Sequence, residues 1–346
     1  MRFTRIILLT SILSLLPFSA TAKDDYKIAW SIYVGWMPWG YAKDSGIVDK
    51  WAEKYGITID VVQFNDYIES INQYTAGAFD GCTMTNMDAL TIPAAGGVDS
   101  TALVVGDFSN GNDGILLKGN KTLADIKGQN INLVELSVSH YTLARALDSL
   151  GMSERDVTVV NTSDADIVAA YTTDDVTSVV TWNPLLSEIM AMPDVSKVFD
   201  SSMIPGEIID MLVVNTDTLA ADPRLGKALA GAWYETMQIM QSSDEARTAM
   251  AEASGTDLAG YNAQLDATEM FYSAEDAVEF VRSADVETTM KNVADFSFKH
   301  GLLGEGAADS GFIGIAFPGG KVLGSESNVK LRFDDIYMGM AAGSEL

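Results

Sequence analysis

Short apolar strands alternate with amphipathic helices along most of this chain, from about residue 26 to residue 215. Strand patterns occupy residues 57–64, 79–84, 101–105, 114–117, 130–134, 157–160, 178–181, 195–199 and 211–215. This alternation is typical of α/β proteins with largely parallel sheets. From residue 222 onward the pattern changes and predicts helices at 222–240, 244–253, 273–282 and 284–300. The sequence therefore predicts an α/β fold that is followed by a helical tail.

The first 22 residues have the pattern of a secretory signal peptide. Arg2 and Arg5 precede a mostly apolar stretch at 6–18, and small residues follow at 20–22. The apolar stretch is short for a membrane span, although retention as an uncleaved anchor is an alternative. We expect cleavage before Lys23 and export to the periplasm, which leaves about 324 residues, enough for two domains.

Composition excludes several classes of partner. The formal net charge of −26 repels nucleic acid and anionic membranes, so neither is an expected partner. The single cysteine, Cys82, excludes an intramolecular disulfide framework, and a hydrophobic content of 47% is sufficient for a core held by apolar burial. We expect an exported monomer that binds a small molecule.

Residues 30–42, WSIYVGWMPWGYA, place many aromatic side chains on a loop that links a strand to a helix. Ligand sites in α/β folds lie at such strand-to-helix loops. We therefore expect a pocket wall here, with core packing as the alternative. Trp30 is assigned to the core, whereas Tyr33, Trp36 and Trp39 are the candidates for ligand contact.

Later loops carry acidic and aromatic side chains close to strand ends. The candidates for ligand contact in these loops are Asp88, Asp113, Glu135, Ser137, His140, Trp182, Asn183, Glu207 and Asp210. Asp88 could equally cap a helix, Asp113 could belong to a turn, and His140 could simply follow a helix cap. These loops contain no Arg or Lys, so they favour a cation over an anion. A planar guanidinium suits them because it stacks on rings and donates paired hydrogen bonds to carboxylates.

Signatures of catalysis are missing from the sequence. It has no P-loop, no GxSxG elbow, no HExxH motif and no paired cysteines for zinc. His140 and His300 lie in unrelated contexts, and His300 suits the end of a predicted helix. We expect no enzymatic activity, no cofactor and no bound metal.

Seven segments carry a resemblance to a known family. They are WSIYVGWMPWGYA (30–42), FDGCTMTNMDAL (79–90), SNGNDGILLK (109–118), VELSVSHYTLARAL (134–147), SVVTWNPL (178–185), IPGEIIDMLVVN (204–215) and MFYSAEDAVEF (270–280). In their order, the chain resembles the substrate-binding proteins of ABC importers of the nitrate, sulfonate and taurine type. More narrowly, it is similar to the receptors associated with urea-carboxylase gene regions.

The resemblance implies a periplasmic-binding-protein fold of type II, in which two lobes enclose a ligand. It implies hinge strands near 115–117 and 212–214, a first lobe of residues 23–117 plus 211–346, and a second lobe of residues 118–210. Closure would place a ligand between Trp36, Asp88 and Asp113 on one side and Glu135, Ser137 and Trp182 on the other.

The resemblance also implies delivery of the ligand to a membrane permease that a cytoplasmic ATPase drives. It favours guanidine or a urea-like nitrogen compound, with taurine or another sulfonate, nitrate and quaternary amines as alternatives. An enzyme like the pyrimidine-precursor synthases of the same fold is a further alternative, disfavoured by the leader and the single cysteine. A sensor module without a transport role also stays open.

Overall fold

The structure is a computed structural model that describes residues 24–346. The predicted signal peptide and the predicted first mature residue, Lys23, lie outside the described residues. Within the described range, no helix has the length and apolar character needed to cross a membrane.

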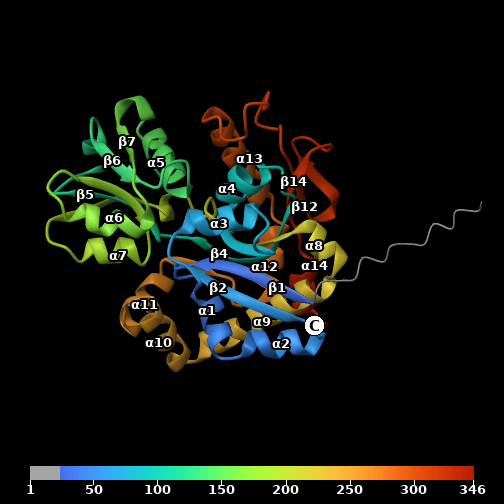
Figure 1. Cartoon of the computed structure of the whole chain (residues 1–346). Coiled ribbons are helices and arrows are strands. Elements are labelled where there is room, and N and C mark those ends of the chain that lie inside the picture. Colours follow the sequence, from blue (N-terminus) through green and yellow to red (C-terminus); the bar gives the residue numbers. More distant parts are fainter. Residues whose placement is uncertain (1–23) are drawn as a thin grey trace, which may run out of the picture.

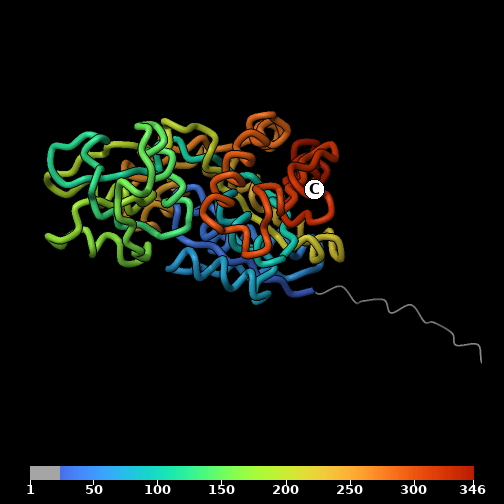
Figure 2. The backbone as a smooth tube through the Cα atoms, turned by 90° about the horizontal axis from the view of Figure 1, so that it is seen from above, coloured from blue at the N-terminus to red at the C-terminus, as the bar shows by residue number. Residues whose placement is uncertain are grey.

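Two mixed β-sheets organise the described residues, and each forms the centre of one lobe (Figure 1). The first lobe has a nine-stranded sheet in the order β13-β12-β14-β4-β10-β3-β1-β2, with β11 paired to β4. The second lobe has a five-stranded sheet in the order β7-β6-β8-β5-β9. Seen from above, the second lobe extends to one side of the first (Figure 2). This arrangement confirms the predicted α/β fold.

The strands of the first lobe are β1 (Asp25–Ser31), β2 (Thr58–Phe64), β3 (Gly81–Thr85), β4 (Ser100–Ser109), β10 (Ile209–Asn215), β11 (Thr268–Met270), β12 (Gly314–Phe317), β13 (Lys321–Leu323) and β14 (Val329–Phe333). Its helices are α1 (Met37–Asp44), α2 (Ile47–Tyr55), α3 (Tyr67–Thr75), α4 (Asn86–Ala89), α8 (Thr216–Ala221), α9 (Pro223–Ser242), α10 (Asp244–Ala253), α11 (Leu258–Leu265), α12 (Ala274–Val281), α13 (Ala284–Lys299) and α14 (Ile336–Ala342). The second lobe contains β5 (Asp113–Lys118), β6 (Asn130–Leu133), β7 (Thr158–Asn161), β8 (Ser178–Trp182), β9 (Val195–Asp200), α5 (Val138–Ser149), α6 (Asp164–Tyr171) and α7 (Leu185–Met190).

The chain crosses between the sheets twice. It leaves the first sheet after β4 and returns to it with β10, which lies antiparallel between β3 and β4. The predicted outward hinge, 115–117, lies inside β5 and therefore already belongs to the second sheet. The predicted return hinge, 212–214, lies inside β10 of the first sheet. The division into residue ranges stays a prediction, and we use "first lobe" and "second lobe" for the parts built on each sheet.

Helix starts follow the capping residues of the sequence. Asp66 accepts a hydrogen bond from the N–H of Glu69 and begins α3, as predicted. Asp222 accepts from the N–H of Arg224, and Pro223 occupies the first position of α9, where its missing N–H costs nothing. Side-chain caps therefore fix where these helices leave the sheet edge.

Two structural expectations from the sequence were wrong. The tail after residue 222 contains β11 to β14 in addition to the helices, and β14 pairs in parallel with β4. The strand predicted at 101–105 instead continues to Ser109 as β4, because β10 pairs with it as far as Ile209 opposite Phe108. In both places, pairing with a distant strand decides the structure of a short segment with weak local preference.

Candidate functional site

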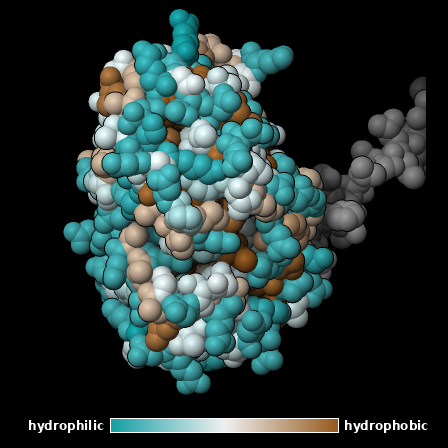
Figure 3. Space-filling model, turned by 90° about the vertical axis from the view of Figure 1, so that its left-hand side faces the viewer, coloured by the Kyte–Doolittle hydropathy of each residue, from teal (hydrophilic) through white to brown (hydrophobic). Residues whose placement is uncertain are grey.

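A cavity of about 250 Å³ lies between the lobes. Its lining residues come from both sides, and they are Tyr33, Trp36, Tyr67, Thr85, Asp113, Val138, Trp182 and Asp210. Two larger hollows, of about 820 and 1540 Å³, have different linings, and all three volumes include open solvent. The surface of the second lobe in Figure 3 is mainly hydrophilic, with scattered hydrophobic residues. The cavity between the lobes differs from these hollows in that every one of its lining side chains is buried.

Four aspartates are buried at this cavity. Asp113 and Asp210 line it, and Asp88 and Asp107 lie directly behind lining tyrosines, each with no more than 3% of its surface exposed. Asp107 on β4 and Asp210 on β10 are cross-strand partners in the first sheet. Among the described residues, no Lys, Arg or His contributes to the lining. Buried carboxylates without a nearby cation are costly, so this cluster calls for a partner that the protein itself does not supply.

Burial raises the pKa of all four carboxyl groups. It brings the pKa of Asp113 to about 7 and that of Asp88 to about 6. Desolvation also raises the pKa of Asp107 and that of Asp210, and the charge of Asp107 raises that of Asp210 further. Two adjacent carboxyl groups cannot both ionise readily, which is one reason why the pKa of Asp210 is raised well above its usual range. Oδ2 of Asp210 and Oδ2 of Asp107 have no hydrogen-bond partner among the described residues.

Two tyrosines connect the carboxylates to the aromatic wall. The hydroxyl of Tyr33 donates to Asp107 over 2.9 Å, and that of Tyr67 donates to Asp88 over 2.7 Å. The hydroxyl of Thr85 also donates to Asp88, and its N–H donates to the hydroxyl oxygen of Tyr67. These bonds hold the two tyrosine rings at the wall of the cavity, which both of them line.

The rings themselves form a chain that crosses from one lobe to the other. Trp36 packs against Tyr33 with a centroid separation of 5.1 Å and against Tyr67 at 5.5 Å. Tyr67 meets Trp182 of the second lobe edge-on at 5.6 Å. Nε1 of Trp36 is buried without a hydrogen-bond partner among the described residues. The aromatic wall is therefore continuous across the lobe boundary, as a closed cleft requires.

A glycine allows the aromatic loop to approach the carboxylates. A Cβ on Gly35 would overlap Oδ2 of Asp107 and the ring of Tyr33. Trp36 then precedes α1, and Pro38 occupies the first turn of that helix. The sequence GWMP at 35–38 thereby brings the ring of Trp36 to the cavity beside Asp107.

Five of the twelve predicted site residues line the cavity, and one more lies directly behind it. Those on the lining are Tyr33, Trp36, Asp113, Trp182 and Asp210, and the one behind it is Asp88. The structure does not bring the other six to the lining.

Two of those six, Asn183 and Glu207, have polar partners elsewhere. The side chain of Asn183 donates to Asn112 and accepts from Ser187, so it holds the end of β8. Glu207 accepts two hydrogen bonds from the guanidinium of Arg145 and one from Tyr141.

The remaining four, Trp39, Glu135, Ser137 and His140, have other positions in the fold. Trp39 is 1% exposed and stacks on Trp233 in the core of the first lobe, at a centroid separation of 5.1 Å. Ser137 caps α5 by accepting from the N–H of Ser139, and Glu135 is exposed. His140 contacts Glu154, away from the cavity lining.

Sequence reasoning did not find Tyr67, Thr85, Val138 and Asp107. Tyr67 directly follows the Asp66 cap, and Val138 begins α5 after the Ser137 cap. First-turn residues after a strand-end cap lie at the carboxyl edge of the sheet, which is a signal that could have found these two. Asp107 gave no such signal, since its place depends on the extension of β4 along β10.

Known proteins share this fold. An alkanesulfonate-binding protein, SsuA, of Xanthomonas axonopodis pv. citri, solved with MOPS bound, matches with a TM-score of 0.68 at 18% identity, over 83% of this chain and 96% of that one. The periplasmic nitrate-binding protein NrtA of Synechocystis PCC 6803 matches with a TM-score of 0.59 at 13% identity, over 92% and 98% of the two chains. These likenesses show the fold of periplasmic binding proteins.

Sequence comparison gives the family. A Brucella abortus relative, named as a presumed binding protein, is 24% identical over 262 residues, which cover 72% of this chain and 79% of the relative. The NMT1-like family matches residues 29–255, about two thirds of the chain. The chain therefore belongs to the NMT1-like family.

Proposed function

We propose that this protein is the exported solute-binding receptor of an ABC importer, and that its ligand is a small planar nitrogen cation, with guanidinium favoured. The fold and the family support the receptor role, because the structural neighbours are named as periplasmic binding proteins for sulfonate and nitrate. The nitrogen cation rests on the cavity of this chain alone.

The observation that carries the proposal is the set of buried aspartates without a basic partner. Asp113 and Asp210 face the cavity, Asp88 and Asp107 lie behind it, and no cationic side chain of residues 24–346 joins the lining. An anion such as nitrate or a sulfonate would add charge of the same sign to a desolvated site. A cation offsets that charge and removes the cost of burying it.

Hydrogen-bonding capacity distinguishes among cations. Oδ2 of Asp210 lacks a donor, so the ligand that fits must supply N–H groups. A quaternary amine has none, and neutral urea supplies donors but leaves the carboxylate charge without compensation. Guanidinium supplies charge, donors in a planar fork, and a face that stacks on Trp36 or Trp182.

The proposed mechanism is capture by closure. Ligand bound to the first-lobe wall would draw Asp113 and Trp182 of the second lobe onto its other side, so its affinity for the closed form exceeds that for the open form. The closed, loaded receptor would then dock on a membrane permease and release the cation there. Under this proposal, the mature protein works in the periplasm and carries out no catalytic step.

Calorimetry of the mature protein tests the ligand class. Guanidinium chloride, urea, taurine, sodium nitrate and tetramethylammonium chloride are titrated separately at one ionic strength. We expect saturable heat with one site per chain for guanidinium and none for the anions. Saturable heat with taurine or nitrate and none with guanidinium would overturn the cation proposal and leave a receptor of the sulfonate or nitrate type.

A further inference from the structure

The only two histidines of the 346-residue chain meet at one carboxylate. Nε2 of His140 lies 3.0 Å from Oε1 of Glu154, and Nε2 of His300 lies 3.2 Å from the same oxygen. These potential ligand atoms all lie within 4.8 Å of one another. The two histidines are 160 positions apart in sequence, so the fold, rather than local structure, brings them together.

The cluster is shielded and its atoms have no other partner. The side chains of His140, His300 and Glu154 are 5%, 12% and 30% exposed. No geometric hydrogen bond reaches either Nε2 or Oε1 of Glu154 among the described residues. Phe296 packs on His300 at a centroid separation of 4.3 Å and supplies an apolar wall. Two imidazoles and a carboxylate thus converge on one partly enclosed point.

The cluster also bridges the lobes. His140 belongs to α5 and Glu154 follows it in the second lobe, whereas His300 ends α13 of the first lobe. Helix α13 lies beside α4 and close to α5 at the top of the view in Figure 1. A group held by all three side chains would therefore connect the two lobes outside the cavity that holds the proposed ligand.

We propose that His140, Glu154 and His300 bind a divalent transition metal ion of the zinc class, with a fourth position left to water. Imidazole nitrogen and carboxylate oxygen are the ligands that zinc accepts in sites with three protein ligands. Two neutral imidazoles and one carboxylate leave a net positive charge on the bound ion, which suits a strongly acidic chain. Since His300 comes from the opposite lobe, the metal ion stabilises the closed form.

One contact must change when the metal ion enters. Nδ1 of His140 accepts the N–H of Leu136 over 3.1 Å, so the ring proton resides on Nε2. Coordination through Nε2 moves that proton to Nδ1 and breaks this hydrogen bond. Leu136 has a φ of 64°, a left-handed conformation that is strained for leucine, and its peptide can rotate away. We therefore expect moderate affinity, weaker than that of a preformed zinc site.

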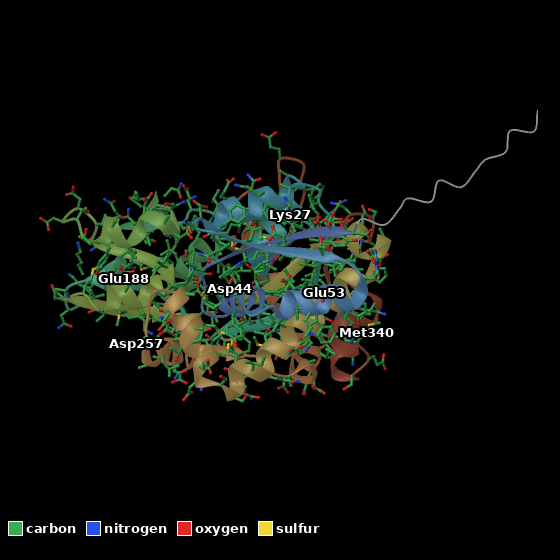
Figure 4. All side chains as sticks on the ribbon, turned by 60° about the horizontal axis from the view of Figure 1, so that its bottom comes forward. Lys27, Asp44, Glu53, Glu188, Asp257 and Met340 are labelled. Carbon is green, nitrogen blue, oxygen red and sulfur yellow. The ribbon has the colours of Figure 1, made fainter. Side chains whose placement is uncertain are left out.

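The proposed metal site does not depend on which ligand the cavity binds, so it is tested with metal ions alone. Mature protein without an affinity tag is titrated with zinc chloride by calorimetry, and the visible absorption of a cobalt(II) complex reports the coordination number. The variants are His300→Gln and Glu154→Gln, each compared with Glu53→Gln, an exposed carboxylate on α2 that Figure 4 labels.

We expect one zinc ion per chain, an affinity at least tenfold weaker in each site variant, and no change in Glu53→Gln. Zinc should also reduce the radius of gyration measured by small-angle X-ray scattering, and His300→Gln should abolish that reduction. Circular dichroism without metal shows whether each variant is folded. Absence of a one-to-one complex, or a folded His300→Gln or Glu154→Gln variant that binds zinc as tightly as the unmodified protein, would overturn the site whatever the outcome with guanidinium.

Discussion

Asp113→Asn changes the one acidic group that the second lobe presents to the cavity. Burial raises the pKa of Asp113 from 3.8 to about 7, so the closed, ligand-free protein carries a proton there at pH 5. A cation that pairs with the carboxylate must displace this proton. Guanidinium binding to the unmodified protein should therefore weaken as the pH falls below 7. The affinity of the Asp113→Asn variant should depend less steeply on pH, because this proton is absent from it.

The magnitude follows from the linkage of proton and ligand. One displaced proton weakens binding about tenfold per pH unit below the pKa, or about 1.4 kcal/mol, which amounts to roughly a hundredfold between pH 7 and pH 5. At pH 8 the variant loses one carboxylate partner of the cation, at a cost of about 2–5 kcal/mol. The neutral amide of the variant also avoids the cost of burying an ionised carboxylate in the closed protein. We therefore expect a loss at the lower end of that range, which corresponds to roughly thirtyfold weaker binding.

Calorimetry from pH 5 to pH 8, in buffers of different ionisation enthalpy, measures both the affinity and the number of protons released. Asp44→Asn is the matched control, because Asp44 is exposed at the end of α1 (Figure 4). We expect the control to retain the affinity and pH slope of the unmodified protein. If Asp113→Asn does so too, Asp113 does not pair with the ligand and the cation argument fails.

Three further predictions follow from the same site. The stability of the ligand-free protein should fall as the pH rises from 5 to 8. The raised pKa values of Asp88 and Asp113 stabilise the folded protein fully below the pKa of an unfolded aspartate, and this stabilisation is lost as the pH rises through their folded pKa values of about 6 and about 7. A melting temperature that does not change with pH would contradict this. Gly35→Ala should weaken guanidinium binding, measured by calorimetry, at least tenfold, since the added Cβ displaces Asp107. Unchanged affinity would show that ligand binding does not require the close approach of the aromatic loop to Asp107. Trp182→Ala should weaken the same binding by about 0.5–2 kcal/mol through loss of the ring face, whereas Glu188→Ala, at an exposed position of α7, should not; equal effects would remove Trp182 from the site.

The sequence predicted most of the elements on which the cleft is built. Helix α10 has the bounds 244–253, as expected, because its cap and its apolar periodicity mark its ends. Strands β12 to β14 were not predicted, because each is short and gains its structure by pairing at the edge of a large sheet. Local signals therefore sufficed where strands alternate with helices, as for β6 and β7, and failed for the strands of the C-terminal tail.

The part of the site that lies at strand ends, and on the loops that follow them, could be predicted from the sequence. Trp36 and Trp182 could be proposed because Trp182 ends β8 and Trp36 lies on the loop between β1 and α1. Choosing between Trp36 and Trp39 required the helix phase of α1, which turns Trp39 onto Trp233 in the core. The role of Asp107 required the register of β4 against β10, a relation between residues about a hundred positions apart.

The ring contact between Tyr67 and Trp182 gives the protein an intrinsic optical reporter. Trp182 is the only tryptophan within residues 113–200, whereas four of the other five lie in the first 60 residues of the chain. Opening of the lobes removes Trp182 from Tyr67 and exposes its indole, and that of Trp36 on the cavity lining, to water, while the other four tryptophans keep their surroundings within the first lobe. The emission of unlabelled protein should thus shift with the fraction of closed molecules, so the rate of closing can be followed by stopped-flow fluorescence.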